Sequence, residues 1–128
     1  LIEEACGDKV FNACGKYTIG QSAYFIKKAK LVISHDTGMM HIASAFSKAI
    51  ISIWGNTIPE FGMYPYMPQC PDRSIIFEVK GLSCRPCSKL GYDRCPKKHF
   101  KCMNEIDLDL VVAEAENIIN STQHLKVL

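Results

Sequence analysis

Apolar residues recur along the chain in two patterns, one with the period of a helix and one typical of a buried strand. The stretch 18–29 begins with Thr18 and Gln21, which match a capping box at a helix start, and its apolar residues then recur every three or four positions. The runs 31–34 and 50–54 are short, apolar and β-branched, as in strands buried on both faces. The sequence therefore predicts one helix and two buried strands.

Between these two strands the helical period returns. It begins at Gly38 and ends near Ser47, and we expect its apolar face to contain Met39, Ile42, Ala43 and Phe46. A strand, a helix and a strand in such quick succession form a βαβ unit, whose strands are parallel and whose crossover is nearly always right-handed.

The remaining pattern completes an α/β fold. A third strand is predicted over 74–79, and Asp107 is expected to cap a last helix. The apolar stripe expected on that helix consists of Val111, Val112, Ala115, Ile118 and Ile119. We expect one domain over 1–128, a Rossmann-like parallel sheet with flanking helices, interrupted by a cysteine-rich, basic excursion over 80–102.

Composition narrows the range of functions. A chain of 128 residues, 48% apolar and 22% charged, is the size of one globular domain, and its formal charge of +2 is too small to predict nucleic-acid binding. It contains no apolar run of about 18 residues and no signal peptide pattern. The chain opens on Leu1 within a helical pattern, so we expect a fragment. Seven cysteines in ordinary α/β sequence indicate a reducing, cytoplasmic location.

The segment between the first strand and the next helix has the chemistry of a phosphate site. Open parallel sheets bind ligands beyond the carboxyl ends of their strands, and a helix start presents free N–H groups with about half a positive charge. Gly38 allows close approach, Thr37 adds a hydroxyl, Asp36 orients the loop or accepts from a sugar, and His41 lies about one turn on. The spacing alone leaves a second interpretation equally open, with Asp36 as an N-cap, Gly38 as a turn residue and His41 in the core.

The residues around this segment resemble the heptosyltransferases of glycosyltransferase family 9. The similarity lies in 30–43, with Ser34-His35-Asp36-Thr37-Gly38-Met39-Met40-His41 at its centre, then in 51–57, Cys84-x-x-Cys87 and Cys102-Met103. Asn56 stands where the family has a proline. The resemblance implies the C-terminal half of a GT-B fold, the half that binds the nucleotide-sugar donor.

The same resemblance implies the reaction. It is an inverting, metal-independent transfer of a heptose, commonly from ADP-heptose, to a lipopolysaccharide-core acceptor at the inner membrane, with no cofactor required. The donor-binding residues carried over to this chain are Asp36, Thr37, Gly38 and His41 for the pyrophosphate, Tyr17 against the adenine, and Met39. The catalytic carboxylate of the family lies in the N-terminal domain, so we expect no catalytic residue in this chain and no transfer by it alone.

The cysteines of the excursion offer a metal site. Cys84, Cys87, Cys95 and Cys102 can supply four thiolates to a tetrahedral zinc ion, and the first pair has a ligand spacing. His99 is a substitute ligand, whereas Cys70 has no assigned role. Disulfides or free buried thiols are the alternatives.

The excursion also holds the densest charge of the chain, with a single acid, Asp93. Its basic residues are Lys80, Arg85, Lys89, Arg94, Lys97, Lys98 and Lys101. They either meet a phosphorylated glycolipid or anionic inner membrane, or form a solvated loop that offsets clustered thiolates. Two rival functions follow for the chain: a nucleotide-binding module without transfer chemistry, and a structural zinc module that binds a partner.

Overall fold

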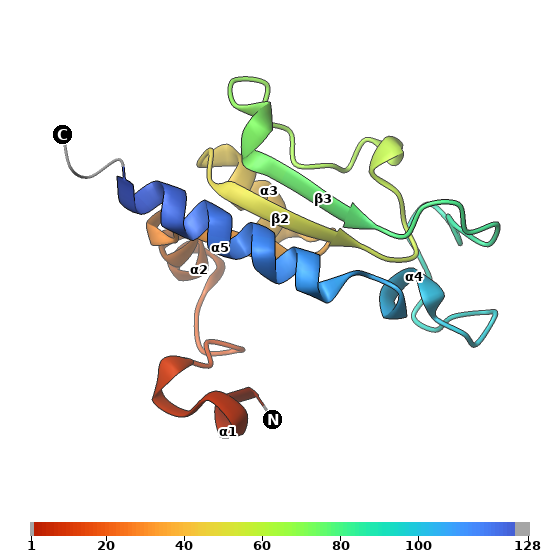
Figure 1. Ribbon diagram of the computed structural model, residues 1–128, viewed down its shortest axis with the longest axis horizontal. Coiled ribbons are helices and arrows are strands. Elements are labelled where there is room, and N and C mark those ends of the chain that lie inside the picture. Colours follow the sequence, from red (N-terminus) through yellow and green to blue (C-terminus); the bar gives the residue numbers. More distant parts are fainter. Residues whose placement is uncertain (1, 125–128) are drawn as a thin grey trace.

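The computed structural model describes residues 2–124, with side chains described for 2–121, and shows a small α/β fold (Figure 1). Its sheet has the strand order β1-β2-β3. These strands are β1 (Leu31–Ser34), β2 (Ala49–Trp54) and β3 (Ser74–Glu78). Both pairings are parallel, with Ile51 of β2 opposite Ile33 of β1 and opposite Ile75 of β3. The predicted α/β class and parallel sheet are confirmed.

Helices cover both faces of this sheet (Figure 1). The α-helices are α1 (Ile2–Cys6), α2 (Ile19–Lys28), α3 (Gly38–Ala45), α4 (Lys101–Asn104) and α5 (Leu108–His124). Short 3-10 turns are η1 (Gly7–Lys9), η2 (Pro59–Phe61) and η3 (Pro71–Arg73). Helix α3 packs with α2 behind β2, and α5 crosses the front.

Two hydrophobic clusters hold these layers together, and successive residues of β2 divide between them. Ile50 and Trp54 pack with Met40 and Ala43 of α3, whereas Ile51 packs with Phe77 of β3 and Val111 of α5. A strand places successive side chains on opposite faces, so β2 needs apolar residues at almost every position to fill both clusters. The run at 50–54, apolar at every position except Ser52, is therefore the expected signature of the central strand.

Local signals at two helix starts are confirmed. The Thr18 side chain accepts from the Gln21 N–H at 3.4 Å, and Gln21 Oε1 accepts from the Thr18 N–H at 2.9 Å, which completes the capping box of α2. Asp107 Oδ1 accepts from the Leu110 N–H at 3.0 Å at the start of α5. Both helices begin where side chains satisfy otherwise free N–H groups.

The phase of two apolar faces differs from the prediction. Helix α3 buries Met40, Ala43 and Ser44, while Met39 and Phe46 are more than a third exposed. On α5, Val111 is buried, but Val112 is 56% exposed. The buried face of α3 is displaced toward Met40, which the prediction left out, and the stripe predicted on α5 was too wide.

One strand is also less covered than expected. Leu31 and Val32 of β1 pack, half-buried, against the clusters on opposite faces of the sheet, whereas Ile33 is 52% exposed, so β1 is only partly buried. The strand lies at an edge of the sheet formed by the described residues, and no packed side chain covers this position. Burial on both faces requires a layer of structure over each face of the strand.

Candidate functional site

The turn between β1 and α3 presents free backbone donors at the carboxyl end of the sheet. Thr37 is the N-cap residue of α3, with an extended backbone (φ −144°, ψ 163°) and no capping bond from its side chain. Within the described residues, the N–H groups of Gly38 and Met39 donate to no acceptor. A Cβ atom built on Gly38 would have no heavy atom outside its immediate neighbourhood within 4 Å. The turn therefore offers two unpaired N–H groups beside open space.

Hydrogen bonds fix the side chains that flank this turn. Asp36 is half-buried, and its Oδ2 accepts from Thr57 Oγ1 at 3.4 Å. The hydroxyls of Ser34 and Thr37 lie 3.1 Å apart. His35 Nδ1 lies 3.0 Å from the carbonyl oxygen of Ile53. Asp36 is thus tied to the loop after β2, and it is not the N-cap, so that part of the second interpretation was wrong.

The other residues assigned to donor binding are placed differently. His41 and Met39 are exposed on the first turn of α3, so the interpretation of His41 as a core residue was also wrong. Tyr17 is half-buried, with its ring centroid 4.8 Å from that of Phe25 and 6.3 Å from that of Phe11. The ring of Tyr17 thus packs with two phenylalanine rings, and its role against the adenine stays a prediction.

A cavity of about 330 Å³ opens next to the turn. One wall is formed by the turn, which contributes Asp36, by the carboxyl end of β2, and by the loop that follows β2, which contributes Asn56. The opposite wall comes from the excursion, with Tyr92, Asp93 and Phe100 among its residues. Its volume lies in the range of small-molecule sites. The sequence did not predict this second wall, because Tyr92 lies 36 positions after Asn56 in a segment without an apolar period. The available signal was Gly91, a turn-forming residue that precedes an aromatic and an acidic residue.

Asn56 holds the excursion against the end of β2. Its side-chain Nδ2 donates to the Tyr92 carbonyl oxygen at 2.8 Å, and its backbone carbonyl oxygen accepts from the Cys87 N–H at 2.9 Å. Gly91 has a φ of +80°, and a Cβ there would come within 2.5 Å of Asn56 Oδ1. A side chain at position 91 is therefore excluded both by backbone conformation and by contact. Asn56 is therefore the anchor of this loop.

Arg85 makes a second attachment. Its side chain is only 6% exposed and donates to the carbonyl oxygens of Gly55 at 2.6 Å and Thr57 at 2.8 Å. It also pairs with Glu78 Oε2 at 2.7 Å, where the Glu78 side chain is 10% exposed. The guanidinium group thus joins the ends of β2 and β3 to the start of the excursion. One of the seven basic residues of the excursion is structural and unavailable to a ligand.

The four cysteines predicted as zinc ligands lie near one another. Burial raises the pKa of Cys87, and the neighbouring Cys84 and Cys95 raise it further. Burial likewise raises the pKa of Cys102, with the same three thiols adding to the effect. The Phe100 N–H and those of residues 97–99 lower the pKa of Cys95 against some desolvation. Even so, in the part of the chain that the structure describes, no three His, Cys, Asp or Glu side chains are arranged to hold a metal ion.

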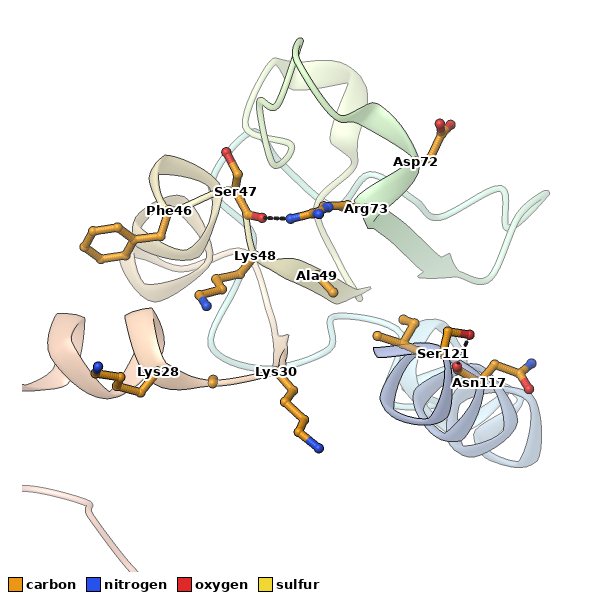
Figure 2. A pocket seen from close by; sticks show the side chains of 12 residues that line it. Lys28, Lys30, Phe46, Ser47, Lys48, Ala49, Asp72, Arg73, Asn117 and Ser121 are labelled. Atoms are coloured by element: carbon orange, nitrogen blue, oxygen red, sulfur yellow. Dashed lines mark hydrogen bonds between the residues drawn. The ribbon is translucent and has the colours of Figure 1, made fainter. Parts of the chain in front are cut away.

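A larger cavity, of about 580 Å³, lies at the other end of the sheet (Figure 2). Lys30, Lys48 and Arg73 line it where the strands begin, and the Arg73 guanidinium donates to the Ser47 carbonyl oxygen at 2.9 Å. Figure 2 shows the lysine side chains pointing in different directions rather than toward one point. This cavity is remote from the turn, so size alone does not identify the site.

Sequence comparison with known families agrees with the motif. The family model for glycosyltransferase family 9 (heptosyltransferase) matches residues 1–91, which include the turn and Asn56. The chain belongs to this family. Residues 92–128, with half of the four-cysteine set, lie beyond the match. No solved structure matches the chain.

Curated relatives are bacterial heptosyltransferases of lipopolysaccharide biosynthesis. Lipooligosaccharide heptosyltransferase 2 of Campylobacter jejuni subsp. jejuni serotype O:2 is 27% identical over 114 residues, which are 89% of this chain and 33% of that protein. Its namesake in Haemophilus influenzae is 29% identical over 53% of this chain and 18% of that protein. Lipopolysaccharide heptosyltransferase 2 of Escherichia coli K12 is 28% identical over 39% of this chain and 14% of that protein. The chain therefore spans about a third of the length of the Campylobacter relative.

Within residues 2–124, the structure has no helix with both the length and the apolar character needed to cross a membrane.

Proposed function

We propose that this chain binds the nucleotide-sugar donor of a heptosyltransferase, with the diphosphate on the turn between β1 and α3. The observation that carries the proposal is the pair of free N–H groups at Gly38 and Met39 at the start of a helix, where a Cβ on Gly38 would meet no heavy atom within 4 Å. Such a helix start stabilises phosphate oxygens through hydrogen bonds and the helix dipole. Thr37 and the exposed His41 supply further donors from the same turn.

The reaction proposed is an inverting, metal-independent transfer of heptose from ADP-heptose to a lipopolysaccharide-core acceptor. The backbone N–H groups of Gly38 and Met39, fixed in advance by the helix start, stabilise the diphosphate as negative charge develops on this leaving group. The base that takes the proton of the acceptor hydroxyl lies in a preceding domain, which completes a GT-B fold. The longer relatives support a preceding domain, and without it we expect donor binding but no transfer. We place the protein in the cytoplasm, in contact with the inner membrane.

The rival function is nucleotide binding without transfer. The turn itself is compatible with both functions, because both need the same phosphate contacts. A catalytic carboxylate in a second Rossmann-like domain would decide for transfer.

Titration of ADP, UDP and GDP tests the donor site. We expect ADP to bind most tightly to the intact protein by calorimetry. His41→Ala should weaken ADP binding roughly tenfold, since a hydrogen bond to a charged group contributes about 1.5–3 kcal/mol. An unchanged ADP affinity would remove His41 from the site, and Asn117→Ala, in the cavity at the opposite end of the sheet, serves as the control.

We propose as a second function of the chain that Cys84, Cys87, Cys95 and Cys102 bind a structural zinc ion. The closeness of the four thiols supports this proposal: burial and the neighbouring thiols raise the pKa of Cys87 and of Cys102. In the described residues the sulfurs do not stand in a metal-binding arrangement. The residues between β3 and α4 form neither helix nor strand, so they can adjust as an ion draws the thiolates together.

Metal analysis of the purified protein tests the zinc site. We expect about one zinc per chain in the wild type and in Cys70→Ser, and clearly less in Cys102→Ser, because the site then lacks one of its four thiolates. Cys70 is the matched control, a free and half-buried cysteine outside the set. Zinc-free wild-type protein with titratable thiols would exclude the site.

A further inference from the structure

The cavity beside the turn is poorly suited to phosphate. None of the described residues that line it is a lysine or an arginine, and two of them, Asp36 and Asp93, carry carboxylates. Carboxylates repel a diphosphate but accept hydrogen bonds from hydroxyl groups. The chemistry of the cavity therefore selects an uncharged ligand with many hydroxyls.

Aromatic side chains on the excursion add a second feature. Tyr92 is 54% exposed and Phe100 is 44% exposed, although both line the cavity. An exposed aromatic ring at a cavity wall offers an apolar face with room for a ligand to pack against it. A sugar ring combines apolar C–H faces with a rim of hydroxyls, which matches such a wall beside carboxylates.

The loop that carries Tyr92 and Asp93 is held in position by its backbone. Asn56 Nδ2 donates to the Tyr92 carbonyl oxygen at 2.8 Å, and Ser88 Oγ donates to the Gly91 carbonyl oxygen at 2.9 Å. Neither bond uses the side chain of Tyr92 or of Asp93. The two side chains are therefore presented by a fixed loop and remain available to a ligand. Asp93 is exposed, with no hydrogen bond or ion pair to any described residue.

The cavity and the phosphate turn share two residues, His35 and Asp36. Asp36 belongs to the turn and also lines the cavity, so a ligand whose diphosphate lies on Gly38 has one end next to this cavity. We propose that the sugar ring of the donor occupies the cavity, with Asp93 accepting hydrogen bonds from its hydroxyls and Tyr92 packing against its face. Asp93 and Tyr92 are then specificity-determining residues, and this inference rests on the proposed donor-binding function.

Two ligands that differ only in the sugar test the inference. The affinities of ADP and of ADP-heptose are measured by calorimetry for the intact wild-type protein and for Asp93→Asn. We expect Asp93→Asn to weaken ADP-heptose at least about tenfold, because a bond to a charged acceptor is lost. ADP should bind equally well or slightly better, because a negative charge near its phosphates is removed.

Two further variants complete the experiment. Tyr92→Ala keeps the backbone bond to Asn56 and should weaken ADP-heptose several-fold while leaving ADP unchanged. Asp72→Asn removes the same charge beside the cavity at the opposite end of the sheet and should change neither affinity. Thermal unfolding confirms that all variants are folded.

The outcomes separate this inference from the function on which it rests. If Asp93→Asn loses equal affinity for ADP and ADP-heptose, the loop contacts the nucleotide. If it loses affinity for neither, the sugar does not lie in the cavity. Either result overturns the inference and leaves the proposed donor binding intact. If the wild type binds no ADP, the proposed function fails and takes the inference with it.

Discussion

Replacing Gly38 by alanine is expected to stabilise the fold and at the same time to weaken donor binding. No protein atom stands in the way of the new methyl group, and alanine favours the helix over glycine by about 0.5–1 kcal/mol. In the complex, however, the methyl group would stand between the N–H donors and the phosphate. Loss of one or two charge-assisted hydrogen bonds lowers ADP affinity roughly 10- to 100-fold. Denaturant unfolding and calorimetry measure the two effects.

Gly20→Ala is the matched control for this substitution. Gly20 lies in the first turn of α2, and a Cβ there also meets no heavy atom within 4 Å. We expect the same gain in unfolding free energy and no change in ADP affinity. If Gly38→Ala binds ADP as the wild type does, the diphosphate does not lie on this turn.

Sequence patterns predicted the elements that local interactions determine. The capping box at Thr18 and the cap at Asp107 require partners only three residues away, and both are present. The apolar run of β2 identified the central strand, because a strand covered on both faces has few polar positions. The motif around Gly38 was also placed correctly, between the end of a strand and the start of a helix, because local patterns determine both elements.

Features that depend on distant packing were not predicted. Periodicity predicted where α3 lies in the sequence, but Met40 rather than Met39 is buried. Which face of the helix is buried depends on how the helix packs on the sheet. The cavity wall at Tyr92 depends on the path of an irregular segment and on an Asn56 contact across 36 positions. No repeat or propensity encodes such a contact. The basic composition of the excursion likewise concealed a buried Arg85.

Replacing Arg85 by methionine is expected to give the largest loss of stability among these variants. The guanidinium group is enclosed by the Glu78 carboxylate and by the carbonyl oxygens of Gly55 and Thr57. Its removal leaves an uncompensated carboxylate that is 10% exposed and carbonyl groups without donors. Breaking a buried pair on one side typically costs about 3–5 kcal/mol, to be measured as the change in unfolding free energy in urea.

A double variant with Glu78 shows whether the charge or the shape of Arg85 is responsible for the loss of stability. Adding Glu78→Gln to Arg85→Met removes the orphaned charge and should recover part of the lost stability. Lys80→Ala breaks the other ion pair of Glu78, at 3.9 Å, but its side chain is 86% exposed, so its effect should stay below about 0.5 kcal/mol. A loss below about 1 kcal/mol in Arg85→Met would contradict the role of this residue as the joint between the sheet and the excursion. A loss of the expected size would mean that the wall bearing Tyr92 and Asp93 depends on a buried charge pair at the end of β3, outside the cavity itself.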